Sequence, residues 1–183
     1  MVVTDTALRE DDALGTWLAR AAPAAGASKR WPDEPAASRR LRCGVIFDAV
    51  VCAQPLIEVA YWLLEGYEQQ LGPAVAYPAH RVGAILVPIG IEERWQELVT
   101  ASEWPARQPR PLCLGSPHTI EVPPAVPDPA AGARWLRDPE VSLVSPPVLT
   151  SPVQLARCLT EALSLGAKAT GEYPLLPAAH GDG

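Results

Sequence analysis

The chain has 183 residues and a formal net charge of −6, and 48% of its residues are hydrophobic. This length suits one domain with a core large enough to need no disulfide or metal. The acidic balance argues against a broad nucleic-acid-binding surface, which is normally basic. Residues 1–12 lack a signal-peptide pattern, and no apolar run reaches the roughly 18 residues of a membrane span. We therefore expect a cytoplasmic protein without a membrane association.

Residues 1–42 are predicted to form a helix followed by a long, basic, proline-containing connection. Thr4 or Asp5 can cap the helix. Its apolar face carries Leu8, Leu14, Trp17 and Leu18. The connection runs from residue 22 to residue 42. Its basic residues are Lys29, Arg30, Arg39, Arg40 and Arg42.

Residues 43–165 are predicted to form an α+β core. The run 43–52 is apolar except for Asp48, which is typical of a buried strand. Pro55 then opens a helix that extends to about Leu71, since proline suits a first helical turn. The elements predicted after this helix are strands at 74–77 and 82–87, a helix at 91–101, and a strand pair at 112–114 and 119–122.

The predicted order of elements is β-α-β-β-α-β with one further strand. This is the order of the split βαβ motif, so we expect a ferredoxin-like or RRM-like core. After a proline-rich loop and the segment 133–137, a last helix is predicted over 152–165, with Ser151 as its cap. Residues 166–183 are predicted to be a flexible tail.

The cysteines and histidines carry no metal-binding spacing. No two cysteines form C-x-x-C, and the three histidines are scattered, which argues against a zinc site. We expect the cysteines to be buried free thiols. The six tryptophans fall mostly at predicted core positions or segment ends, so no stacking platform for bases is expected on the sheet.

Asp48 is the candidate that stands out, because a carboxylate within a buried strand must be paired, metal-bound or at an exposed face. Side chains alternate along a strand, so a second metal ligand belongs two residues away. Those positions hold Ile46 and Val50, and Val51 is also apolar. A structural role is favoured, with ligand contact and catalysis as alternatives.

Four other residues are candidates for ligand binding. Ser116 and His118 form a Ser-x-His pair, which can bind a nucleotide phosphate or be an ordinary turn before a strand. Arg42 and Arg81 belong to a set of loop arginines that either line an anion-binding face or are solvated individually.

Short motifs along the core resemble a known family. They are Phe47-Asp48-Ala49-Val50, Leu71-Gly72-Pro73, Arg81 in the predicted hairpin, Leu86-Val87-Pro88, Trp104, Pro123-Pro124 and Arg134-Trp135-Leu136. Together they resemble short bacterial proteins of the bifunctional DNA primase/polymerase N-terminal type, in the archaeo-eukaryotic primase superfamily. The resemblance covers roughly residues 40–160.

This resemblance implies an RRM-like core and a site with an acid-x-acid metal motif, a Ser-x-His motif and a later acid. Asp48 matches the first acid, but Val50 and Val51 stand where a second acid belongs. The remaining matches are Ser116, His118 and Glu121. The resemblance therefore implies a degenerate site in which Asp48 is a vestige of metal binding.

We expect a non-catalytic primase/polymerase-like domain that acts as a regulatory or interaction protein, with a protein partner or a second copy of itself. A nucleotide or nucleic-acid partner is a further alternative, which the net charge does not support. One alternative is a metal-dependent nucleotidyltransferase with an atypical site, which would use Mg²⁺ or Mn²⁺. Another is a ferredoxin-like module that binds a small molecule or a partner. No cofactor is expected outside the enzyme alternative.

Overall fold

The computed structural model describes residues 14–22, 39–123, 131–140 and 146–170. Residues 14–19 are helical. The elements that follow are β1 (Arg39–Arg42), β2 (Asp48–Ala53), α2 (Gln54–Gly66), β3 (Ala74–Tyr77), the 3₁₀ helix η2 (Pro78–His80), β4 (Val82–Val87), α3 (Glu92–Ala101), β5 (Leu112–Leu114), β6 (Thr119–Val122), β7 (Arg134–Arg137) and α4 (Pro152–Thr170). The chain is therefore α+β, as predicted.

The strands of the described part form two antiparallel sheets. Five strands make the larger sheet, in the order β5-β2-β4-β3-β7, and β1 pairs with β6 in a separate ribbon. The long central ladder joins β2 and β4, with Asp48 opposite Val87 at one end and Ala53 opposite Val82 at the other. This register fixes which candidate residues can meet.

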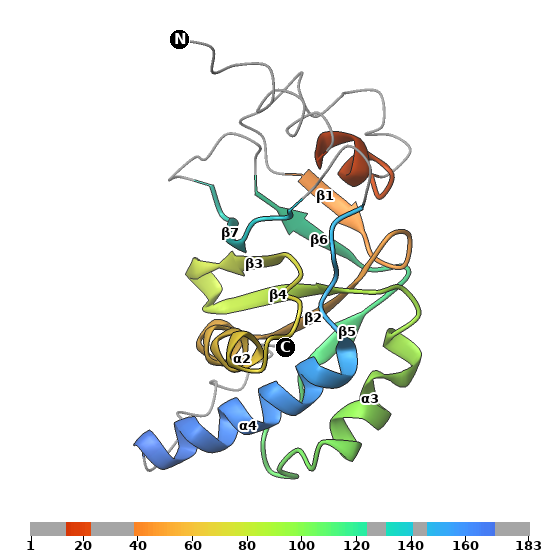
Figure 1. Cartoon of the computed structure of the whole chain (residues 1–183). Coiled ribbons are helices and arrows are strands. Elements are labelled where there is room, and N and C mark those ends of the chain that lie inside the picture. The colour runs from red at the N-terminus through yellow and green to blue at the C-terminus, as the bar shows by residue number, and fades with distance from the viewer. Residues whose placement is uncertain (1–13, 23–38, 124–130, 141–145, 171–183) are drawn as a thin grey trace, which may run out of the picture.

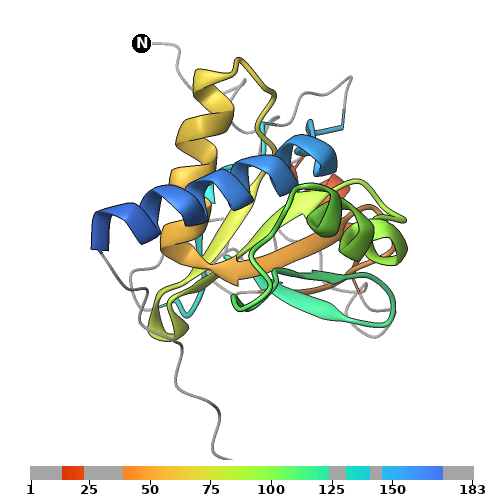
Figure 2. The same cartoon turned by 90° about the horizontal axis from the view of Figure 1, so that it is seen from below.

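The molecule has three layers (Figure 1). Helices α2, α3 and α4 cover one face of the five-stranded sheet, and the β1–β6 ribbon lies beyond the other face. Alternation along β4 explains why both faces are apolar: Ile85 and Val87 join the core under the helices, whereas Ala84 and Leu86 join the core under the ribbon. Figure 2 shows the helical layer from below.

Helix α4 closes the helical layer by packing against both α2 and α3. Its buried side chains recur at the three- and four-residue spacing of one helix face. They are Leu155, Ala156, Cys158, Leu159, Ala162 and Leu163. Each buried leucine contributes roughly 1.5–3 kcal/mol, so this face is a major part of the core. None of the described helices is both long and apolar enough to cross a membrane.

Backbone geometry corrects two predicted boundaries. The first core strand begins at Asp48 and not at residue 43, because residues 43–46 form a turn in which Gly44 has φ 76°. The following helix ends at Gly66 and not near Leu71. Glu68 has a left-handed φ of 53°, which a continuing helix cannot accommodate.

Pairing corrects the predictions for the sheet edges. The segments 112–114 and 119–122 are strands but do not pair with each other, since β5 pairs with β2 and β6 pairs with β1. The predicted connection 22–42 contains β1, and the segment 133–137 contains the edge strand β7.

The ends of the chain differ from the prediction in one respect. The last helix continues to Thr170 and not to residue 165. Residues 171–183 of the predicted tail lie outside the described residues, as do Leu8 and the predicted caps Thr4 and Asp5. Within the described part, Trp17 and Leu18 of the first helix are buried in the core under the ribbon.

Candidate functional site

Asp48 caps helix α3 from a neighbouring strand. Asp48 and Val50 are two residues apart on β2, so their side chains lie on the same face of the sheet, the one covered by the helices. Only 1% of Asp48 is exposed. Its Oδ2 atom accepts hydrogen bonds from the backbone N–H groups of Ile91, at 2.7 Å, and Glu92, at 3.1 Å. Residue 91 provides no side-chain cap of its own. A carboxylate here satisfies two free N–H groups and complements the helix dipole.

The second oxygen of the same carboxylate has a different environment. Oδ1 of Asp48 is buried and accepts no hydrogen bond from any described residue. Buried polar atoms usually have a partner, so this atom is the one feature of the corner that the cap leaves unexplained.

The thiols of Cys43 and Cys113 lie near the Asp48 carboxylate and are poor candidates for metal ligands. Burial, followed by the charges of Asp48 and Glu92, raises the pKa of both Cys43 and Cys113 to about 12. A thiol binds metal as thiolate, which these environments disfavour. The described residues also contain no group of three or more His, Cys, Asp or Glu side chains placed to hold a metal ion. The residues present therefore do not fit the two-metal centre that the family resemblance implies.

The loop that carries His118 approaches the same helix start. The Nδ1 atom of His118 lies 3.2 Å from the carbonyl oxygen of Gly115 and 3.9 Å from Oε1 of Glu92. A Cβ atom on Gly115 would collide with the Glu92 carboxylate, so the loop and the helix touch directly. Half of the His118 side chain is exposed. The structure thus brings His118 close to the side chain of Glu92, whose backbone N–H group binds Asp48.

Ser116 lies in the same loop, beside the turn at Gly44. Its backbone nitrogen would be 2.7 Å from a Cβ atom on Gly44, so the absence of a side chain at Gly44 permits the close approach of these two turns. Ser116 itself is exposed. Among the described residues it forms no side-chain hydrogen bond that would fix it toward Asp48.

The two candidate arginines do not join this corner. Arg81 follows η2, next to the Ala53–Val82 end of the β2–β4 ladder, whereas Asp48 is at the other end. Five residues of strand separate the two ends, which corresponds to roughly 17 Å. Arg42 belongs to β1, and its Nη2 atom donates to the carbonyl oxygen of Ala22 at 3.4 Å. The four candidate ligand-binding residues therefore do not form one anion-binding site.

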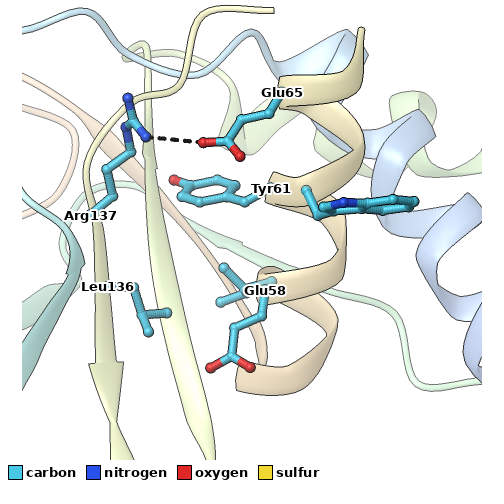
Figure 3. A pocket seen from close by; sticks show the side chains of 7 residues that line it. Glu58, Tyr61, Glu65, Leu136 and Arg137 are labelled. Carbon is cyan, nitrogen blue, oxygen red and sulfur yellow. Dashed lines mark hydrogen bonds and ion pairs between the residues drawn. The ribbon is translucent and has the colours of Figure 1, made fainter.

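A second site lies between α2 and β7. It is a hollow of about 260 Å³. The lining residues, which define the Trp62 groove, are Ile57, Glu58, Tyr61, Trp62, Glu65, Leu136 and Arg137. Figure 3 shows Tyr61 and Glu65 of α2 extending toward Arg137 of β7. Trp62 is 66% exposed, the largest value among the large hydrophobic side chains of the described residues.

The Trp62 groove has a fixed floor. Ile57 is fully buried beneath it, and a Cβ atom on Gly83 would lie 2.7 Å from Cδ1 of Ile57 and 3.7 Å from Cδ1 of Leu136. The hydroxyl group of Tyr61 donates to the carbonyl oxygen of Gly72 at 2.9 Å. Burial raises the pKa of Tyr61, so the phenol stays neutral and keeps this hydrogen bond.

Carboxylates outnumber cations around the groove. Arg137 pairs through Nη1 with Glu65 at 3.4 Å and through Nη2 with Glu140 at 3.2 Å (Figure 3 draws the first pair). Oε1 of Glu58 accepts a hydrogen bond from Nε2 of Gln54 at 2.8 Å. No described lysine or arginine forms an ion pair with Glu58.

Sequence reasoning missed this groove, since it placed the tryptophans mostly at core positions or segment ends. Trp62 is an exception, because it lies within α2 and is 66% exposed. The signal was present in the helical spacing: Ala60, Leu63 and Leu64 are buried on one face, and Trp62 falls between them on the opposite face. The contribution of β7 was not accessible, because its pairing with β3 is a long-range contact.

A scan against family models, a search of curated proteins and a search of solved structures each find no match to this chain. The resemblance to primase/polymerase proteins therefore stays a prediction from the motifs.

Proposed function

We propose that the chain is a primase/polymerase-like domain of the bacterial cytoplasm that acts as a regulatory or interaction protein and does not use Asp48 for metal-dependent catalysis. The observation that carries this proposal is the pair of hydrogen bonds from Ile91 and Glu92 to Oδ2 of Asp48. A carboxylate that would otherwise be a metal ligand serves as a helix cap.

The arrangement of the sheet supports a ferredoxin-like topology as part of the proposal. The units β2-α2-β3 and β4-α3-β5 are two βαβ halves, and the order β5-β2-β4-β3 alternates strands of one half with strands of the other. That interleaving is expected of a split βαβ fold, with β7 added beside β3.

A nucleotidyltransferase is the second candidate, and one observation favours it. Oδ1 of Asp48 is buried without a hydrogen-bond partner among the described residues, and Glu92 and His118 lie close by. A divalent cation is one group that would satisfy such an oxygen. In that case Oδ2 of Asp48 caps helix α3 while Oδ1 binds the cation.

Thermal unfolding with metal and nucleotide separates the two candidates. The wild type is measured alone, with Mn²⁺, with dNTPs and with both. A ligand at 100 times its Kd adds about 2.7 kcal/mol. For a chain of this size that raises Tm by about 5–11 °C.

We expect no shift that requires metal and nucleotide together. Asp48→Asn is measured beside Asp138→Asn, a matched change at an exposed carboxylate remote from the corner. A joint shift that Asp48→Asn abolishes and Asp138→Asn retains would contradict the proposal and favour the enzyme.

A further inference from the structure

We propose that the Trp62 groove binds an arginine-bearing segment of a partner protein, with the guanidinium group seated between Trp62 and Glu58. This inference rests on the proposed interaction function, and it names the surface and the chemistry of the partner.

The exposure of Trp62 is the first observation behind this inference. Glu58 and Trp62 are four residues apart on α2, as are Tyr61 and Glu65, so these four side chains form one continuous patch on the helix. Trp62 is 66% exposed, so most of the hydrophobic free energy that its burial would contribute is not gained in the free protein. Tryptophan on a rigid element is a frequent anchor in protein interfaces.

The shape of the groove is largely fixed before any partner binds. Tyr61 is held by its hydrogen bond to Gly72, and Arg137 is held between Glu65 and Glu140. The floor of the hollow is packed against the sheet. Binding to such a surface orders few side chains, which lowers the entropic cost of association.

The charges around the Trp62 groove favour a cationic partner. The groove lining holds two carboxylates, Glu58 and Glu65, and one cation, Arg137, which pairs with Glu65 and also with Glu140 outside the lining. Glu58 accepts only the neutral amide of Gln54 among its described contacts, so its charge is open to an incoming cation. An anionic ligand would meet net repulsion here.

Arginine fits this combination better than lysine. Its planar guanidinium group stacks on an aromatic face and offers two parallel N–H donors to a carboxylate, whereas the ammonium group of lysine is a strongly hydrated point charge. An indole and a carboxylate one helical turn apart provide both contacts at once. The partner is therefore expected to present arginine in an extended or loop segment.

Nuclear magnetic resonance with a model peptide tests this inference. The probe is a synthetic peptide of about ten residues with alternating arginine and glycine, titrated into the full ¹⁵N-labelled chain. Matched peptides carry lysine or citrulline, the neutral analogue of arginine. We expect shifts of the Trp62 indole signal and of amides in α2 and β7, weaker binding of the lysine peptide, and none of the citrulline peptide.

Two variants give the quantitative result. Trp62→Ala and Glu58→Gln change exposed side chains and should fold normally. Each is expected to weaken binding roughly two- to fivefold, the factor that corresponds to a cation–π contact or ion pair at an exposed site. Glu97→Gln on the exposed face of α3 makes the same charge change away from the groove and should leave the affinity unchanged.

Three results would overturn the inference. Equal weakening by Glu97→Gln and Glu58→Gln would show that the peptide responds only to net charge. Shifts confined to residues outside α2 and β7 would place the binding surface elsewhere. Absence of any shift would exclude an arginine site. None of these results contradicts the proposed interaction function. That proposal is tested separately, by the stabilisation with metal and nucleotide described above.

Discussion

Oδ2 of Asp48 lies 2.7 Å from the backbone nitrogen of Ile91, so a strand residue caps a helix whose preceding residue lies 43 positions later in the chain. This contact links the first strand of the core to α3 and fixes the helix over the sheet. It also explains why a single acid can be kept in an apolar strand: the cost of burying the charge is offset by two N–H donors and a helix dipole.

Removal of this cap should destabilise the protein. Asp48→Ala is expected to lower the free energy of unfolding by about 1–2 kcal/mol, because two N–H groups at the start of α3 lose their acceptor. Asp48→Asn should cost less, since its amide oxygen still accepts. Urea unfolding measures both, with Asp138→Asn as the control. An Asp48→Ala variant as stable as that control would show that the cap contributes nothing.

The turn at Gly44 should tolerate a side chain less well than the turn at Gly90. Both glycines have positive φ, 76° and 80°, so Gly→Ala imposes a similar backbone strain of about 1 kcal/mol at each. A Cβ atom at Gly44 would also lie 2.7 Å from the backbone nitrogen of Ser116, whereas nothing lies within 4 Å at Gly90.

Gly44→Ala is therefore expected to cost more than Gly90→Ala, by about 1–3 kcal/mol. Chemical denaturation of the two variants in parallel gives the difference directly. Equal losses of stability would mean that the Ser116 loop moves away freely, and the two turns would then not be rigidly joined.

Truncation to alanine should destabilise the protein strongly at Trp95 and very little at Trp62. Trp95 is fully buried and donates through Nε1 to the carbonyl oxygen of Pro111 at 2.8 Å. Trp95→Ala is expected to cost about 3–5 kcal/mol, from the cavity and the acceptor left behind. Trp62→Ala should change stability by no more than about 0.5 kcal/mol. A large loss in Trp62→Ala would assign Trp62 to the core and remove the argument for a binding surface.

Stability should fall at high pH because thiols that are buried or half-buried in the folded chain resist ionisation. The pKa of Cys43, Cys52 and Cys113 is raised from 9.0 to about 12, first of all by burial. Below pH 9 these thiols are protonated in the folded and the unfolded chain, and their contribution is complete. As the pH rises from 9 to 12, only the unfolded chain loses these protons, so the free energy of unfolding decreases.

Urea unfolding between pH 7 and pH 11 measures this dependence. Burial also raises the pKa of Tyr61 and Tyr77, which adds to the loss above pH 10. Cys52→Ala should therefore reduce the slope between pH 9 and pH 10, where the tyrosines contribute little. A stability that is constant from pH 7 to pH 11 would show that the thiols ionise freely in the folded chain.

Local sequence patterns predicted many of the helices and strands, but they did not predict which strands pair. Alternation and periodicity predicted the strands at 74–77 and 82–87, and a helix over 91–101 that the structure places at Glu92–Ala101. The partners of β5 and β6 were not, because a short strand carries no mark of the strand beside it. The same limit hid the Trp62 groove, which needs α2 and β7 together.

The candidate site was only partly predictable for the same reason. Strand alternation is a local rule, so the lack of a second acid two residues from Asp48 could be read from the sequence, and it predicts that no two-metal centre forms here. Its actual partners are backbone N–H groups at Ile91 and Glu92, which no sequence pattern identifies. Arg81 was a candidate as one of a set of loop arginines, and the register of the β2–β4 ladder places it next to the end opposite Asp48.

The most direct test of the central claim is paramagnetic broadening by Mn²⁺ at the start of α3. The amide signals of Ile91 and Glu92 report on an ion at the Asp48 carboxylate, because both N–H groups contact its Oδ2 atom. If Asp48 serves as a cap, these signals broaden no more than the signal of the exposed Glu97 in the presence of Mn²⁺ and dNTPs. Selective broadening at Ile91 and Glu92 that Asp48→Asn abolishes would contradict the account and establish a metal site in this corner.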